Sequence, residues 1–534
     1  MRRSPIPATL TVCALVTLAA VALGLGCSSS SPSGPDDNGG DDQPGEFVYV
    51  DPSYVGEELG TQDKPFNTIE EGIDAAGKGD IVVLAAGTYA GRTDIDVPRV
   101  MTIRGAGAGS SIVDARFSVS ADPDTQAVRI KSLSCEEVMF WGNRAELVVD
   151  PGDTVFAPIV VDSCAVDTVD VGYPATHSYT IRNSVITYGV GFNHGYVFDS
   201  ALNEVRNCMV GRGVRFAHGG GDVTNIVENC SIAGAVTLLQ GAGSTNTISS
   251  NTVNGILDSS GACATVISNN VLPTGDLVDK SGGWGSEDQF IEWNEIENGV
   301  VILTSGNATC RYNTINAPAE TIALKAYCGA PANVVGNTIT LPYEELDPET
   351  YHGIGILASC GAGVVTDNTI TGGALGILDR CAATEISGNV ISGAHMGMFL
   401  GHPNGKDIRG NTVTGCVADG VVVERYYVGG LAYGVFEDNT FADNGGAGLR
   451  LLYPADVGGG AQNSLGGNVL TGNGDYDLVV EVPADTAAVI YARHNTWDHA
   501  TEGEIDSDDV YDANDDGSLA DVDFMPLGSG GGAW

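Results

Sequence analysis

The sequence is poor in basic residues. Only 24 lysines and arginines stand against 68 aspartates and glutamates, which gives a formal net charge of −44. An acidic surface of this kind repels nucleic acid and anionic lipid, so the composition argues against both as partners. Three interpretations of the acidity stay open: a solvated or salt-adapted surface, Ca²⁺ binding, or a preference for cationic or neutral glycans over polyuronates.

The repeats also lack helical periodicity, and aromatic residues make up only 7% of the chain. Glycine, by contrast, occurs 74 times. Short segments rich in β-branched residues alternate with corners of Gly and Asn. This alternation predicts an all-β chain of many short strands.

An asparagine recurs along the chain with a period of about 22 residues, which predicts a solenoid. We expect a right-handed parallel β-helix with a short N-terminal capping helix and an irregular acidic C-terminal cap. Asn tolerates the left-handed conformation of a tight corner and bonds neighbouring backbone groups, so stacked copies are expected to form a ladder. The recurring residues are Asn183, Asn207, Asn229, Asn251, Asn270, Asn294, Asn313, Asn337, Asn368, Asn389, Asn411, Asn439, Asn468 and Asn495.

The N-terminus resembles a bacterial lipoprotein signal. Two arginines precede an apolar run that ends at Cys27. Residues 1–27 are therefore expected to be a lipoprotein signal segment in which Cys27 is the lipidation site and stays on the chain after the residues before it are cleaved off. Gly24 departs from the usual Leu, and an uncleaved single-span anchor is the alternative. Either interpretation exports the chain and tethers it to a bacterial cell envelope, and the lipid anchor is expected to hold it at the outer membrane or cell surface. We expect residues 28–46 to form a flexible tether. The β-helix is expected to span residues 47–500, and the C-terminal cap and tail residues 501–534.

Cysteine spacing does not indicate a zinc site, because no CxxC or Cys/His pattern occurs. Cys208 and Cys230 lie one period apart, as do Cys360 and Cys381. Such pairs would stack on adjacent coils, either as disulfides or as buried free thiols.

Both ends of the repeat region resemble known β-helix proteins. Residues 47–105 contain KPFNTI, GDIVVL, GTY and TIRG, and resemble the opening of exported proteins of the pectate-lyase-like superfold. Within them, Phe66, Ile69, Ile73 and Ala76 form one face of a helix expected to cover the open end of the solenoid. Residues 494–527 resemble the closing segment of β-helix repeat proteins related to the NosD family. The resemblance implies a fold that hosts lyases, hydrolases, epimerases, adhesins and binding proteins.

The sequence does not contain the motif sets expected of familiar enzymes of this superfold. Gly-Asp-Asp occurs only at residues 40–42, in the segment before the repeats, and neither His194 nor His218 has a Gly before it, as a polygalacturonase-like site would require. Lys325 ends a predicted strand, but no carboxylate cluster accompanies it locally. We therefore assign no known enzyme mechanism from the sequence.

One surface patch is a candidate for glycan binding. Alignment of five Gly-led strands places acidic, basic and aromatic residues after neighbouring strands, and a solvated corner with ordinary ion pairs is the alternative. Loops 273–289 and 342–352 are candidates for the walls of a groove. The patch comprises Asp379, Arg380, His402, Glu424, Arg425, Tyr426 and Tyr453.

A second candidate is a Ca²⁺ loop near the C-terminus. Asp512, Asn514, Asp516 and Asp523 match the oxygen-ligand spacing of such a loop, with Gly517 at the tight turn. A purely structural acidic cap is the alternative.

From the sequence we therefore expect a monomeric, envelope-anchored β-helix that binds polysaccharide or a surface partner. A Ca²⁺-assisted polysaccharide lyase or a glycoside hydrolase is the alternative. A NosD-like role in metal maturation is disfavoured, because no His/Met cluster suited to copper occurs.

Overall fold

The computed structural model divides the chain into two units, Met1–Gln43 and Pro44–Trp534. It describes residues 45–527 of the second unit, with gaps at 92–93, 121–127, 141–158, 173–177, 195–200, 220, 241–242, 262–263, 280–287, 305–306, 328–331, 348–349, 351, 360–361, 381–382, 402–404, 425–433 and 488. The predicted signal, Cys27 and most of the tether lie outside the described residues. In the described part, no helix has both the length and the apolar character needed to cross a membrane.

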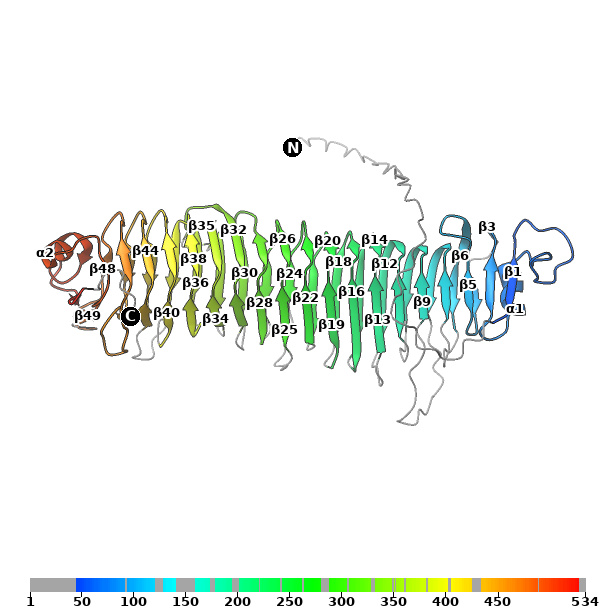
Figure 1. Cartoon of the computed structure of the whole chain (residues 1–534), viewed down its shortest axis with the longest axis horizontal. Helices are drawn as coiled ribbons and strands as arrows, with labels where there is room; N and C mark the ends of the chain where they lie inside the picture. Colours follow the sequence, from blue (N-terminus) through cyan, green and yellow to red (C-terminus); the bar gives the residue numbers. More distant parts are fainter. Residues whose placement is uncertain are drawn as a thin grey trace, which may run out of the picture. The chain divides into compact units, whose positions relative to one another are not determined.

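The unit from Pro44 onward is a parallel β-solenoid, as the asparagine period predicted (Figure 1). Sheet A has 18 strands, from β1 (Phe47–Val50) to β46 (Ala455–Asp456). Each coil continues from sheet A through a short strand of sheet B, such as β14 (Met209–Val210), to a strand of sheet C, such as β15 (Gly213–His218). In the first coils sheets B and C are continuous, because β12 (Val185–His194) pairs with both β14 and β15.

The solenoid core is one continuous apolar column that runs from Val48 to Phe524. Alternate residues of each strand point into it, as the two-residue period of a strand requires. Within this column Phe192 and Phe216, in register on β12 and β15, stack with ring centroids 4.7 Å apart. No coil could bury its apolar face alone, so stability depends on the stacking of neighbours.

The predicted capping helix is confirmed as α1 (Ile69–Ala75). The Thr68 side chain accepts a hydrogen bond from the backbone N–H of Glu71, which caps the first turn. Ile69 and Ile73 are buried on the same face of the helix. The helix lies beside β1 at one end of the solenoid, where it covers the core (Figure 1).

The asparagine ladder is confirmed from Asn251 to Asn495. Each Asn in this stretch donates its backbone N–H to the Oδ1 of the next, at 2.9–3.1 Å, and its Nδ2 to the same atom, at 2.8–3.0 Å. These side chains are buried, so the ladder satisfies amide groups that would otherwise be left unpaired.

The ladder assignment is wrong for Asn183, Asn207 and Asn229. These three residues are exposed, at positive φ, one position before the ladder. Cys208 and Cys230 hold the ladder positions of their coils as buried free thiols, and the Cys230 N–H donates to Asn251. The left-handed conformation belongs throughout to the residue before the ladder, where Asn is favoured for its backbone tolerance. The other predicted pair, Cys360 and Cys381, lies outside the described residues.

The winding continues past the boundary predicted at residue 500. Strand β48 (Leu478–Val480) pairs in parallel with β50 (Val510–Tyr511), so the cap adds a further strand to sheet C. Between them lie α2 (Glu502–Glu504) and a π-helix, η1 (Ile505–Asp509). A two-stranded sheet, β49 (Val489–Tyr491) with β51 (Asp521–Asp523), accompanies this end.

Candidate functional site

The predicted glycan patch is only partly at the surface. Asp379 ends β36 (Leu375–Asp379) with its side chain fully buried, where it forms an ion pair with Lys406 and accepts from the Ala383 N–H at 3.2 Å. Tyr453 is also buried, in the solenoid core. The placement of these two residues in an exposed patch is therefore wrong, because both side chains point into the core.

Among the remaining patch residues, Arg380 and Glu424 each come directly after a strand of the same sheet, at equivalent positions of their coils. One coil lies between them, and Gly401 holds the equivalent position there. Arg380 is half-buried and Glu424 is exposed. His402, Arg425 and Tyr426 lie outside the described residues.

Lys406 is a buried cation that sequence reasoning missed. Burial lowers the pKa of its ammonium group to about 7, while the Asp379 carboxylate beside it favours the charged form and opposes this effect. The two residues are 27 positions apart, across a corner loop, so no local motif reveals the pair.

In the described part of the loop 342–352, Leu346 packs on the outer face of sheet C. Ile354, Leu357, Leu375 and Leu378 form a second apolar cluster, on the outer face of that sheet, and Leu346 of the loop packs against it. Trp284 of the other predicted wall lies outside the described residues.

The predicted Ca²⁺ loop uses its oxygens for internal hydrogen bonds. Both carboxylate oxygens of Asp512 accept backbone N–H groups, from Asn514 and from Val522, each at 2.8 Å. Asp516 accepts from the Ser518 N–H at 3.0 Å, and Asp523 forms an ion pair with Arg493. Asn514 donates to Asp506 at 2.8 Å. Ca²⁺ binding by these four residues stays a prediction, and it requires that these bonds be exchanged for metal contacts.

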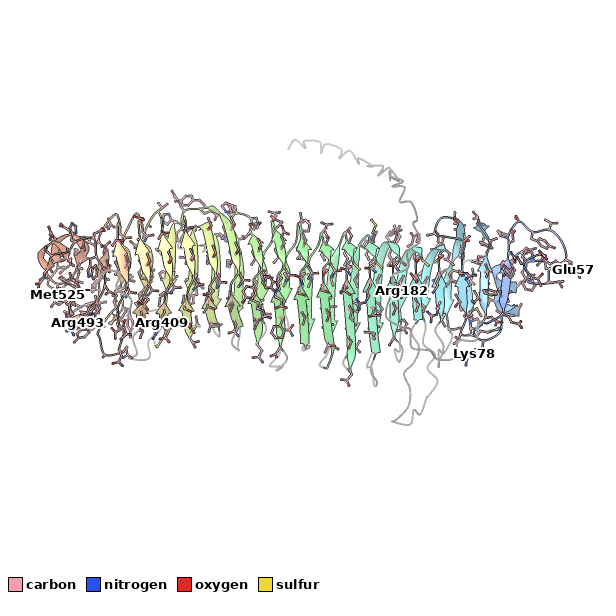
Figure 2. The ribbon with its side chains drawn as sticks, viewed as in Figure 1. Glu57, Lys78, Arg182, Arg409, Arg493 and Met525 are labelled. Atoms are coloured by element: carbon pink, nitrogen blue, oxygen red, sulfur yellow. The ribbon has the colours of Figure 1, made fainter. Side chains whose placement is uncertain are left out.

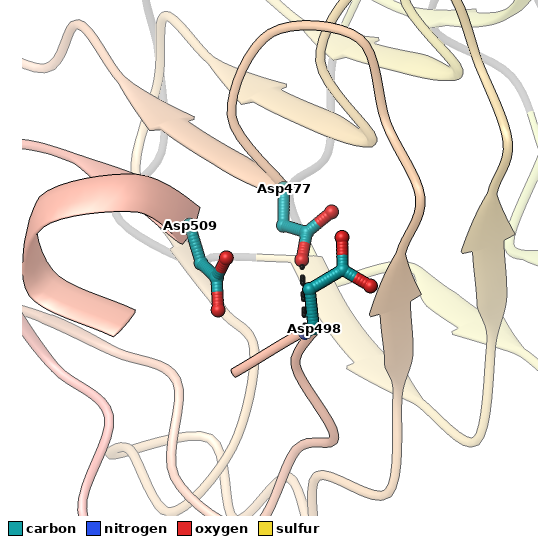
Figure 3. Close-up of side chains that lie close together, drawn as sticks. All are labelled: Asp477, Asp498 and Asp509. Atoms are coloured by element: carbon teal, nitrogen blue, oxygen red, sulfur yellow. Dashed lines mark hydrogen bonds between the residues drawn. The ribbon is translucent and has the colours of Figure 1, made fainter. Parts of the chain in front are cut away.

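Three other carboxylates do converge at this end. Asp477, Asp498 and Asp509 offer oxygens that all lie within 4.8 Å of one another, the one such group among the described residues (Figure 3). Asp477 and Asp509 are buried, and Asp498 is exposed. The spacing suits shared protons or a divalent cation, since oxygen donors are what Ca²⁺ prefers.

The register between neighbouring coils brings two members of this cluster, Asp477 and Asp509, together. Leu449, Leu478 and Val510 are opposite one another in sheet C, so the residues before them, Gly448, Asp477 and Asp509, stack in a column.

Hydrogen bonds hold the cluster in place, and burial changes its protonation. Asn473 donates to Asp477 at 2.7 Å, and the His499 ring nitrogen Nδ1 lies 2.7 Å from Asp509. Burial, with the charges of Asp498 and Asp509, raises the pKa of Asp477 to about 7, against the opposing effect of the Asn473 hydrogen bond.

A groove of about 410 Å³ lies on the outer face of sheet C, across β10 (Ala165–Val171), β12, β15 and β18 (Ala235–Gln240). Asp170, Gly191, Arg215 and Thr237 occupy successive coils of one outward-facing row. Adjacent strands are about 4.8 Å apart, so Asp170 and Arg215 lie on opposite sides of a floor formed by Gly191.

The acid and the base of this groove are not paired with each other. Asp170 accepts from the Asn193 side chain at 3.1 Å. Arg215 is exposed and contacts no carboxylate within the described part of the chain. A Cβ on Gly191 would lie 3.0 Å from the Asp170 carboxylate, so the absence of a side chain keeps the slot open.

An exposed aromatic ring adjoins the groove. Arg212 is one of the residues that line the groove, and its guanidinium lies over the Tyr188 ring at 4.7 Å from its centroid. Sequence reasoning missed the groove because its members are 21 to 24 residues apart and meet only through the coil register. The glycines at 189, 191 and 213 were the available signal.

Comparisons with known proteins give no activity. A protein family of unknown function, DUF1565, matches residues 313–502. No curated protein matches the chain. Among solved structures, a PL6 alginate lyase in complex with a trisaccharide has 12% identity and a TM-score of 0.26, with 70% of this chain and 86% of that chain covered.

Two further structures show similar values. A mannuronic acid specific polysaccharide family 6 lyase from human gut microbiota has 11% identity, coverage of 80% and 86%, and a TM-score of 0.22. The A-module of the Azotobacter vinelandii mannuronan C-5 epimerase AlgE4 has 13% identity, coverage of 72% and 100%, and a TM-score of 0.23. TM-scores this low carry no argument about activity. With its coils stacked in parallel, the chain is a β-helix repeat protein, as the resemblance of its two ends implied.

Proposed function

We propose that the protein binds polysaccharide in the groove on the outer face of sheet C. The observation that carries this proposal is that Asp170 and Arg215 stand on either side of the Gly191 floor without forming an ion pair with each other. Sugar hydroxyls both donate and accept hydrogen bonds, so a carboxylate and a guanidinium on opposite sides of a slot suit them. Tyr188, held by Arg212, adds an aromatic surface at the rim.

The same groups support a second candidate, cleavage of the bound glycan. A carboxylate beside an arginine suits β-elimination in a uronic-acid glycan, in which a base removes the C5 proton, the C4–O bond breaks and the leaving oxygen takes up a proton, whereas hydrolysis uses two carboxylates. Asp170 is the group that would accept or donate a proton, and Arg215 the group that would stabilise developing negative charge.

A glycan array probed with the full-length protein tests the proposal. Arg215→Ala and Asp170→Asn are expected to weaken binding by about 1.5–3 kcal/mol each, the usual loss for a hydrogen bond to a charged group. Arg409→Ala is the matched control, because Arg409 is an exposed arginine on sheet A with its own carboxylate partners.

Retained binding in Arg215→Ala and Asp170→Asn, or binding lost equally in Arg409→Ala, would reject the groove. Release of new reducing ends or of unsaturated products from a bound glycan would establish the second candidate.

We also propose that the chain is exported and tethered through acylated Cys27. The support is the apolar run before Cys27 and the Ser/Pro/Gly/Asp segment after it. A labelled fatty acid is expected to enter the wild-type protein in cells and to be absent from Cys27→Ser, which should be mislocalised. Equal labelling of both proteins, or labelling of neither, would contradict the lipid anchor.

A further inference from the structure

A column of left-handed corner residues follows sheet A along the solenoid. From Ser132 to Asp438, each member donates its backbone N–H to the carbonyl just before the next member, as Trp293 does to Arg311 at 3.3 Å and Tyr312 to Val335 at 3.1 Å. The described members with positive φ, between 53° and 76°, are Ser132, Ser163, Asn183, Asn207, Asn229, Ser250, Asn269, Trp293, Tyr312, Gly336, Asp367, Gly388, Gly410, Asp438, Gly467 and His494.

Trp293 and Tyr312 are the two bulky aromatic residues among the described members of this column. Positive φ is readily adopted by Gly and tolerated by Asn and Asp, while a bulky side chain there is an outlier. Every other member of the column is Gly, Asn, Asp, Ser or His. Strain of this kind is typically retained where it serves a function. Two adjacent coils therefore carry strained aromatic residues at the same position.

The two rings form one exposed stack. Their centroids are 4.6 Å apart with planes 24° from parallel, and Trp293 is 55% exposed while Tyr312 is 43% exposed. On the far side, the Tyr312 ring rests on Gly336, where a Cβ would come within 2.6 Å of it. On the other side the next corner is Asn269, and more than half of the Trp293 surface is open to solvent.

Hydrogen-bonding groups surround the stack. Asn269 is exposed at the neighbouring corner. The Arg311 side chain donates to Glu292 at 2.6 Å, and its guanidinium lies 6.0 Å from the Tyr312 centroid. An apolar ring face bordered by an amide, a carboxylate and a guanidinium matches a ligand with an apolar face and a polar edge.

The surroundings identify one class of ligand. Nucleobases also stack on aromatic rings, but a net charge of −44 repels a phosphate backbone. A stable protein partner needs about 800 Å² of contact on each side, and the corners flanking the stack carry only an Asn and a Gly. A pyranose ring has a C–H face that packs on an indole and hydroxyls that reach the groups around it.

We propose that the Trp293–Tyr312 stack is a saccharide-binding platform on which a pyranose ring packs against the exposed surface of Trp293. The platform is separate from the sheet C groove and does not depend on that groove.

Isothermal titration of the full-length protein with cellohexaose, chitohexaose and mannohexaose tests the platform. Trp293→Asn is expected to weaken the observed binding by roughly tenfold or more, where tenfold corresponds to 1.4 kcal/mol. Trp293→Phe should retain most of it, because a ring remains. Thermal melting of Trp293→Asn should be unchanged or higher, since Asn relieves the backbone strain at this position.

Unchanged binding in both Trp293→Asn and Tyr312→Asn would overturn the platform. So would a fall in the melting temperature of Trp293→Asn large enough to account for its lost binding. Failure of all three sugars to bind the wild-type protein would also overturn it. Arg215→Ala separates this site from the groove. Binding lost in Arg215→Ala alone leaves the groove standing and the platform rejected. Binding lost in Trp293→Asn alone supports the platform and counts against the groove.

Discussion

At the scale of single residues, the protonation of Asp477 links the stability of the fold to pH. Its pKa is raised to about 7 by burial and neighbouring carboxylates, so the folded protein holds a proton that the unfolded chain, with a pKa near 3.8, releases. The stabilisation is complete below about pH 4 and is lost as the pH rises through 7. We predict that melting temperature falls over this window, and that Asp477→Asn removes most of the fall.

Each pKa unit corresponds to about 1.4 kcal/mol, so the effect is measurable by calorimetry at several pH values. Asp521→Asn is a control that removes one carboxylate of the same cap outside the cluster. A wild-type profile that is flat between pH 4 and 7 would contradict the burial of an ionisable Asp477.

Calcium titration at pH 8 decides which carboxylates of the cap bind a cation. A rise in melting temperature that Asp477→Asn abolishes would place the ion at Asp477, Asp498 and Asp509. A rise that Asp516→Ala abolishes would place it in the predicted loop 512–523. No rise in the wild type would leave the cap a structural element.

At the scale of the structural element, sheet A gathers like charges in an acidic protein. Arg104 of β5 (Thr102–Arg104) lies opposite Lys131 of β7 (Arg129–Lys131), and Lys131 in turn lies opposite Asp162. Burial lowers the pKa of Lys131, and the charges of Arg129, Arg182 and Arg104 lower it further, against the opposing effect of the Asp162 carboxylate. Like charges on directly opposed residues destabilise a sheet.

We therefore predict that Lys131→Gln raises the free energy of unfolding by roughly 0.5 kcal/mol, within the range for cross-strand pairs. Arg409→Gln is the matched control, farther along the same sheet, where Glu437 and Asp407 pair with the arginine (Figure 2). Its stability should be unchanged or lower. Denaturant unfolding measures both variants, and a less stable Lys131→Gln would contradict the repulsion.

At the scale of the whole molecule, the repeat period predicted the coil because the ladder position recurs in every turn. It misplaced Asn183, Asn207 and Asn229, since the ladder in those coils is held by Ser or Cys and the adjacent Asn serves the corner. Spacing alone does not distinguish two neighbouring positions that both favour Asn.

The functional residues were harder to predict for a different reason. The register of strands in three successive coils places Asp170 and Arg215 in the same groove, with Gly191 between them. An error of one residue in a predicted register moves a side chain from the surface into the core. That error is what placed Asp379 in an exposed patch. The groove and the buried Asp379–Lys406 pair therefore require the structure, while the coil and its capping helix follow from the sequence.

A crystal structure of the protein with an oligosaccharide selected on the glycan array tests the groove most directly. The account predicts sugar density between Asp170 and Arg215, over Gly191, with hydrogen bonds to both side chains. Oligosaccharide bound elsewhere while this groove holds only water would contradict the central claim.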